Sequence, residues 1–142
     1  FSAYDFVILD TAPSVGGILE LAIFAADRVI IPTACESGSI EGLEQTLKML
    51  EELKTGGWEG SLLGILPTFF DERTKERRMI NAYLARQYGE ARLSPIHEST
   101  ALRELPNYQV TIFEKADADG KKKTADRAAQ EFEDLARKVA RR

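Results

Sequence analysis

Short apolar runs alternate along the chain with stretches in which apolar residues recur at three- and four-residue steps. The runs are typical of strands buried on both faces, and the spaced residues indicate amphipathic helices. Strands are predicted over 6–10, 28–32, 62–67 and 92–96. Helices are predicted over 17–26, 39–54, 75–88 and 124–139, with a helical turn at 100–105. This alternation indicates an α/β fold, a three-layer, mostly parallel sheet with helices on both faces.

The composition fits one folded domain. The chain has 142 residues, of which 44% are hydrophobic and 30% charged, and it holds one cysteine, Cys35. No apolar stretch approaches the roughly 20 residues of a membrane span. A single thiol without a partner favours a cytosolic protein with a plain buried cysteine. Because the chain begins with Phe1 and carries no signal peptide, we expect it to be a piece of a longer product.

The charge is unevenly distributed. Residues 1–60 carry three basic and ten acidic residues, whereas residues 61–142 carry 16 basic and 13 acidic ones. Five basic residues gather at and along the helix predicted over 75–88: Arg73, Lys75, Arg77, Arg78 and Arg86. They form either a solvated face balanced by Glu72 and Glu76 or a surface that binds DNA nonspecifically through its phosphates.

The first predicted strand ends in Asp10, and a turn with Pro13 and Ser14 follows. An aspartate at the carboxyl end of such a strand lies where open α/β sheets bind ligands. Beside a phosphate-binding loop it could hold the hydrated Mg²⁺ of a nucleotide. The chain contains no G-x-x-x-x-G-K-[ST] loop. The residues alone therefore favour a strand-end turn residue for Asp10, with the metal role as the alternative.

Several segments in one register resemble the ParA/Soj partition ATPases, whose relatives with deviant Walker motifs include MinD. They are Tyr4–Asp10 with Pro13-Ser14, Ala25–Pro32, Glu36 with Glu41-Gly42-Leu43, Leu63–Thr74, and Glu104-Leu105-Pro106. The resemblance implies a P-loop NTPase-like fold truncated at the amino terminus. It implies that residues 1–142 are the carboxyl-terminal part of a ParA-like ATPase domain, a single domain without the part that supplies the phosphate loop.

The resemblance also implies site residues. Asp10 takes the Walker B position and holds Mg²⁺ through water. Pro13 and Ser14 lie in the loop that senses the γ-phosphate. The remaining nucleotide-binding positions lie near the base, in two segments: Thr68, Phe69, Phe70 and Asp71, and Pro95, Ile96 and His97. The family commonly has Ile-Pro-Arg-Asn where this chain has Ile96-His97-Glu98-Ser99, so the usual arginine is replaced by glutamate. Without the family, His97 is a surface or hydrogen-bonded histidine.

The resemblance implies a cytoplasmic, nucleoid-associated protein of plasmid or chromosome partition. The full-length parent would bind ATP and Mg²⁺, dimerise, bind DNA nonspecifically and respond to a ParB-like stimulator. The present chain is expected to be inactive and to hold no nucleotide tightly, because phosphoryl transfer depends on the positioning that the missing loop provides. The edge of the strand over 6–10 should be open to pairing, which favours a homodimer.

Two alternatives stay open. The chain could be a non-catalytic interaction module, a paralogue without a phosphate loop. It could also be a MinD-like spatial regulator that reaches the membrane through its last helix. That helix carries only a thin apolar stripe of Phe132, Leu135 and Val139. Its acidic residues would repel anionic lipid, so we expect packing against the sheet and no membrane binding.

Overall fold

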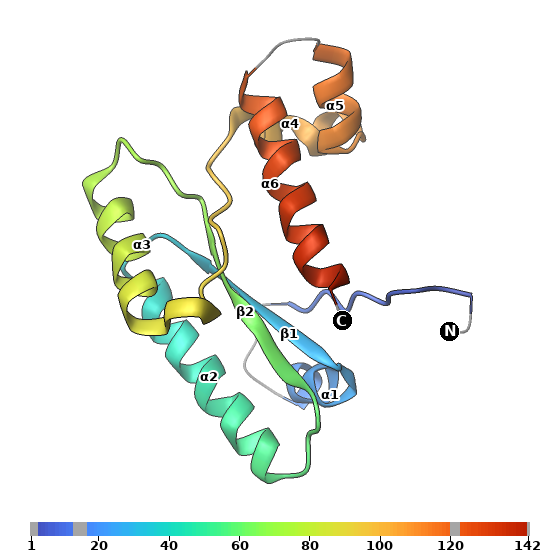
Figure 1. The fold of residues 1–142 in the computed structure, drawn as a ribbon, viewed down its shortest axis with the longest axis vertical. Coiled ribbons are helices and arrows are strands. Elements are labelled where there is room, and N and C mark those ends of the chain that lie inside the picture. The colour runs from blue at the N-terminus through green and yellow to red at the C-terminus, as the bar shows by residue number, and fades with distance from the viewer. Residues whose placement is uncertain (1–2, 13–16, 120–122, 142) are drawn as a thin grey trace.

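The structure is a computed structural model that describes residues 3–12, 17–119 and 123–141. Two strands and six α-helices follow one another in these parts of the chain (Figure 1). They are α1 (Gly17–Ala25), β1 (Arg28–Ala34), α2 (Ser39–Thr55), β2 (Ser61–Thr68), α3 (Lys75–Tyr88), α4 (Thr100–Tyr108), α5 (Ile112–Asp119) and α6 (Lys123–Ala140), with a 3-10 turn, η1 (Gly89–Ala91), after α3. The α/β class is confirmed.

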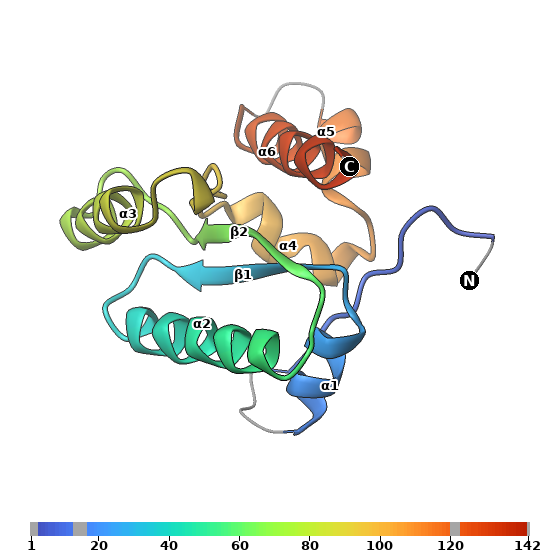
Figure 2. The ribbon, with the colours of Figure 1, turned by 60° about the horizontal axis from the view of Figure 1, so that its bottom comes forward.

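The centre of the fold is a parallel pair of strands between two helical layers. β1 pairs with β2 from Arg28↔Ser61 to Ala34↔Thr68, with one irregularity between Val29 and Ile30. Helices α1 and α2 lie on one side of the pair, and α6 lies on the other (Figure 2). Because side chains alternate along a strand, neighbouring residues of β1 supply the cores of opposite layers.

The core on the α2 side joins both strands to three helices. Its buried residues include Ile31 of β1, Ile65 of β2, Leu43 and Leu50 of α2, Ile23 of α1 and Leu84 of α3. The two leucines of α2 are one heptad apart, which is the spacing that keeps one helix face on the sheet. Helix α2 ends at Thr55, and the N–H of the following Gly56 donates to the Glu52 carbonyl at 2.9 Å. The apolar periodicity therefore predicted this helix to within one residue.

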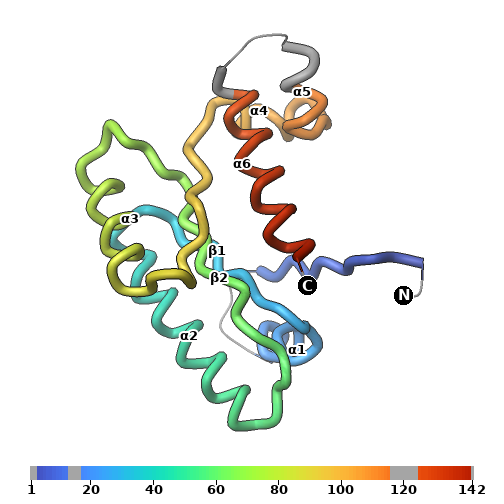
Figure 3. The backbone as a smooth tube through the Cα atoms, in the orientation of Figure 1, coloured from blue at the N-terminus to red at the C-terminus, as the bar shows by residue number. Residues whose placement is uncertain are grey.

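The opposite layer consists of the last three helices. Helices α4, α5 and α6 share a small core of Ala101, Ile112, Ala125 and Ala128. Phe132 and Leu135 of α6 pack against Leu66, Leu93 and Ile96. The expectation that the last helix packs against the sheet is confirmed, and the smooth backbone trace in Figure 3 shows it alongside the strands. Within the described ranges, each helix is too short or too polar to span a lipid bilayer.

Helix α5 was not predicted. It begins with a reciprocal cap: the Thr111 N–H donates to the Glu114 carboxylate at 2.8 Å, and the Glu114 N–H donates to the Thr111 hydroxyl at 3.2 Å. This is the capping-box arrangement of a threonine followed three residues later by a glutamate. The signal lies in Thr111-Ile112-Phe113-Glu114, and the helix that follows it is eight residues long.

The prediction of a strand over 6–10 is wrong. This segment has no regular secondary structure, and its apolar side chains are exposed, from 48% for Phe6 to 88% for Ile8. An apolar run indicates that its side chains favour burial, but a strand also needs a neighbouring strand whose N–H and C=O groups face its own. In the described part of the chain, the sheet consists of β1 and β2 alone.

The prediction of a strand over 92–96 is also wrong, although this segment runs alongside β2. Two isolated parallel bridges hold it, Ile65↔Arg92 and Phe70↔His97. A continuous ladder is interrupted because Pro67 and Pro95 have no N–H to donate. The close approach depends on Gly64, where an added Cβ would lie 2.6 Å from Leu93 Cγ.

Candidate functional site

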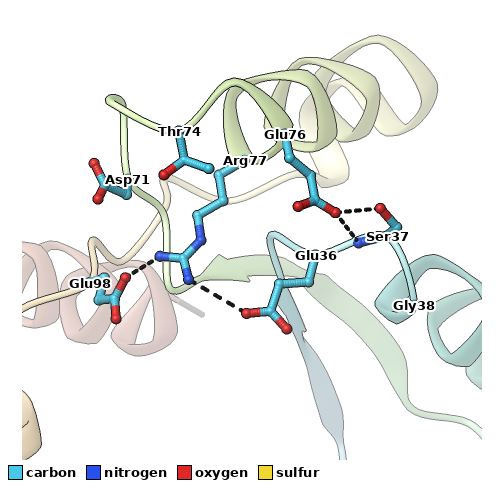
Figure 4. A pocket seen from close by; sticks show the side chains of 8 residues that line it. All are labelled: Glu36, Ser37, Gly38, Asp71, Thr74, Glu76, Arg77 and Glu98. Atoms are coloured by element: carbon cyan, nitrogen blue, oxygen red, sulfur yellow. Dashed lines mark hydrogen bonds and ion pairs between the residues drawn. The ribbon is translucent and has the colours of Figure 1, made fainter.

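An open pocket of about 460 Å³ lies where β1 and β2 end and α2 and α3 begin (Figure 4). Residues after β1 supply Glu36, Ser37 and Gly38; the approach to α3 and its first turn supply Asp71, Thr74, Glu76 and Arg77; and Glu98 completes the lining. The carboxyl edge of a parallel sheet is the usual ligand-binding edge of α/β proteins. The pocket is therefore the candidate functional site.

Arg77 is the central cation of this pocket. Its guanidinium forms a short ion pair with Glu98 and lies 3.5 Å from the Glu36 carboxylate, and 19% of its side chain is exposed. The hydrogen bond to Glu98 raises the pKa of Arg77 further above its ordinary value. Glu98 also contacts Arg103 of α4 at 3.1 Å. These ion pairs connect α3, α4 and the loop after β1.

The other carboxylates of the pocket are partnered locally. Asp71 pairs with Arg73 at 2.8 Å and accepts the Arg73 backbone N–H at 2.9 Å. These hydrogen bonds hold the pKa of Asp71 well below its ordinary value. Glu76 accepts hydrogen bonds from the Ser37 N–H and hydroxyl, which likewise lower its pKa. The pocket thus holds four carboxylates around one partly buried guanidinium, and its surface is acidic.

The two segments assigned to the base lie side by side. The Phe70 N–H donates to the Ile96 carbonyl at 3.2 Å, and the Ile96 N–H donates to the Pro67 carbonyl at 2.9 Å. Thr68 ends β2, and Phe69 follows with a left-handed φ of 52° and a half-exposed ring. The adjacency follows from the structure, whereas nucleotide binding by these residues stays a prediction.

His97 fastens the second of these segments to α6. Its Nδ1 lies 2.6 Å from Glu131 Oε1, and its backbone N–H donates to Glu131 Oε2 at 2.9 Å. The imidazole also packs on Phe70 with ring centroids 4.9 Å apart. The hydrogen-bonded role expected for the single histidine is confirmed. Pro95 and Ile96 are therefore held between β2 and α6.

The basic cluster divides into two groups. Arg73 and Arg77 are paired with Asp71 and Glu98, as described above. Lys75, Arg78 and Arg86 are exposed, and none of the three forms an ion pair within the described residues. At about 100° per residue, Lys75 and Arg86 fall on nearly the same side of α3, while Arg77 falls on the opposite side. The helix thus presents three cations to solvent.

The candidate metal residue lies apart from this pocket. Asp10 is exposed and belongs to no helix or strand. Pro13 and Ser14 lie outside the described residues. Among the residues that the structure describes, no group of three or more histidine, cysteine or acidic side chains could hold a metal ion. One exposed carboxylate without a phosphate loop does not by itself fit ATP·Mg²⁺.

Glu36 belongs to the segments that carry the family resemblance and Glu98 replaces the family's usual arginine, but their pairing with Arg77 was not predicted. Glu36 follows β1 as Asp10 follows the first apolar run, so its position at a strand end was a usable signal. Glu131 pairs across 34 residues with His97, and Glu98 with Arg77 across 21. Such distant pairs leave no local pattern. Cys35 is fully buried, as expected, and burial raises its pKa.

Comparison with solved structures defines the class of protein. The chain superposes on the ATP complex of a Cyanothece McdA variant with a TM-score of 0.67 and 21% identity, covering 82% of this chain and 44% of that one. The apo McdA structure gives a TM-score of 0.59 at 23% identity, covering 75% of this chain and 46% of that one. The fold is that of a P-loop NTPase-like α/β protein.

Sequence comparison then gives the family. The AAA_31 family, described as an AAA domain, matches residues 1–59. Soj of Thermus thermophilus, a chromosome-partitioning ATPase, is 35% identical over 80% of this chain and 46% of its own length. ParA of Myxococcus xanthus, a chromosome partitioning protein, is 41% identical over an alignment that covers 78% of this chain and 40% of that protein. The chain belongs to the ParA/Soj-type partition ATPase family. It spans about half the length of these relatives.

Proposed function

We propose that this chain is the carboxyl-terminal part of a ParA-type ATPase that moves plasmid or chromosomal DNA. The observation that carries the proposal is the similarity to Soj and ParA over about four fifths of the chain. The whole protein uses ATP and Mg²⁺, with Asp10 as the magnesium residue, and forms a homodimer in the cytoplasm. A ParB-like protein stimulates it.

The exposed apolar surface supports the proposal of a larger domain. Ile18, Leu21 and Phe24 of α1 are 80%, 72% and 51% exposed, and the segment Phe6–Leu9 is exposed as well. Isolated apolar side chains are common on protein surfaces, but a contiguous apolar helix face indicates a contact with another protein segment. Further strands and helices of the same domain would bury this surface and give the segment 6–10 a pairing partner.

DNA binding is assigned to the outward face of α3. Lys75, Arg78 and Arg86 are the exposed cations of that helix, and no base-reading motif accompanies them. Contacts of this kind go to phosphates, so the binding is nonspecific and weakens steeply with salt. Arg77 is assigned no DNA contact because its guanidinium is mostly buried and paired with Glu98, whereas Arg73 pairs with Asp71 but is 90% exposed and stays a candidate.

The first experiment measures binding to a labelled duplex at low salt. The Lys75→Gln/Arg86→Gln double variant should lose most of the affinity. The matched control, Lys48→Gln/Arg137→Gln, removes the same charge from exposed positions on α2 and α6 and should bind almost like the parent chain. Equal losses in both variants would indicate a net-charge effect and would contradict the assignment to α3.

The second experiment measures binding of a fluorescent ATP analogue with Mg²⁺ to the 142-residue chain and to Asp10→Ala. We expect neither protein to bind at micromolar concentration, because the sequence lacks a phosphate loop. Micromolar binding that disappears in Asp10→Ala would mean that the chain completes a nucleotide site without the loop. ATP turnover by the purified chain would contradict the proposed inactivity.

The second candidate function is a non-catalytic interaction module. The missing phosphate-loop motif favours it, and the exposed face of α1 would then bind another protein. A reading frame upstream of Phe1 that encodes Lys-Gly-Gly-x-Gly-Lys-Thr would decide for the ATPase. A MinD-like role at the membrane is disfavoured because Phe132 and Leu135 of α6 are packed against the sheet layer.

A further inference from the structure

Glu98 is the point at which two arginines from different helices meet. Its Oε2 pairs with Nη1 of Arg77 on α3, and its Oε1 lies 3.1 Å from Nη2 of Arg103 on α4. The backbone fixes the position of this carboxylate, since the Glu98 N–H donates to the Phe70 carbonyl at 2.8 Å. Each carboxylate oxygen therefore faces its own guanidinium.

Two guanidinium groups that converge on one pair of oxygens form a donor set that also suits a phosphate. In this chain the Glu98 carboxylate occupies the position that such a phosphate would take. The side chain of Glu98 is 23% exposed and that of Arg103 is 66% exposed, so the pair lies at the surface and a nucleic-acid backbone could reach it. From these contacts we infer that Glu98 competes with DNA phosphate for Arg103 and thereby limits the affinity of the chain for DNA.

The two arginines differ in how strongly they depend on Glu98 as a partner. Arg77 also lies 3.5 Å from Glu36 and only 19% of it is exposed, so it stays partnered when Glu98 is neutralised. Arg103 has no second carboxylate partner among the described residues. Removal of the Glu98 charge should therefore free Arg103 to make about one additional phosphate contact. This inference rests on the DNA binding proposed above.

The test compares Glu98→Gln with the parent chain in duplex binding across a salt series. One added phosphate contact steepens the slope of log K against log salt by about 0.9. The affinity gain over the parent should then shrink about 3-fold to 4-fold between 50 and 200 mM salt. The matched control is Glu133→Gln, which neutralises an exposed carboxylate of α6 that also pairs with an arginine, at 2.7 Å. The control should leave the slope unchanged.

Arg103→Gln provides a second, independent variant. It should hardly alter DNA binding in the parent chain, where Glu98 already neutralises Arg103, and it should abolish the gain in the Glu98→Gln background. Thermal unfolding of each variant verifies that it is folded. A Glu98→Gln slope equal to that of the parent, or an equal gain with Glu133→Gln, would overturn the role of Glu98 while leaving DNA binding by α3 intact. Absence of DNA binding in both parent and Glu98→Gln would overturn both proposals.

Discussion

Gly64→Ala tests whether the close contact between β2 and the segment after η1 positions the site. An added Cβ would lie 2.6 and 2.7 Å from two atoms of the Leu93 side chain and 2.8 Å from the Ala91 carbonyl oxygen. Carbon atoms in favourable contact are about 3.5–4.0 Å apart, so the neighbours must move by about 1 Å. Leu93 is buried and the Ala91 oxygen belongs to the backbone, so neither can move aside easily.

We expect Gly64→Ala to lower the free energy of unfolding by about 2–3 kcal/mol, the upper part of the range for overpacked cores. For a domain of this size the loss corresponds to about 5–10 °C in Tm. The strain should also separate the segment from β2. The amides of Leu93 and Ile96, which bond to the Ile65 and Pro67 carbonyls at 2.8 and 2.9 Å, would then exchange with solvent faster.

Urea unfolding and amide hydrogen exchange measure the two effects. The control is Gly42→Ala in α2, where an added Cβ meets no atom within 4 Å. Alanine is the better helix former there, so Gly42→Ala should gain about 0.5–1 kcal/mol. A Gly64→Ala protein as stable as the parent, with Leu93 and Ile96 still protected, would refute the packing argument.

Three further predictions follow from individual contacts. Arg73→Gln should raise the pKa of Asp71, measured by NMR titration, towards the ordinary carboxyl range. In the parent protein Asp71 stays ionised at acid pH, where the unfolded chain takes up a proton. Its contribution to the free energy of unfolding therefore falls as the pH falls. Cys35 should react slowly with a thiol reagent in the native protein and quickly in urea. Because its pKa is raised, the parent loses stability as alkaline pH ionises the unfolded thiol. Arg28→Met removes hydrogen bonds to the Val139 and Arg141 carbonyls at the end of α6 and should cost about 1–2 kcal/mol in urea unfolding.

The sequence predicted the elements whose signals are local. The periodicity of Leu43, Leu47 and Leu50 gave α2 nearly to its end, and the run Arg28–Pro32 gave most of β1. The segment 6–10 carries an equally strong apolar run, yet no strand forms there. Pairing depends on a neighbouring strand, which the run itself does not encode.

The site was predicted less completely than the fold. Resemblance to a family selected residues 68–71 and 95–97, and the structure places these two segments side by side. Counting basic residues along α3 gave five candidate DNA contacts, but it could not reveal that Arg77 pairs with Glu98. Charge patterns locate cations on a helix, whereas their availability depends on acidic residues that are distant in sequence.

The contact between Arg28 and the end of α6 also bears on the order of folding during synthesis. Its two hydrogen bonds join residues 113 and 111 positions apart. A ribosome makes about 5–20 residues per second, so β1 and β2 leave it several seconds before α6 is complete. Until then, Ile30 and Leu66 lack the Phe132 and Leu135 side chains that cover them. The nascent chain therefore leaves this face of its sheet only partly covered until α6 emerges, and during this interval the uncovered part is open to aggregation and to chaperones.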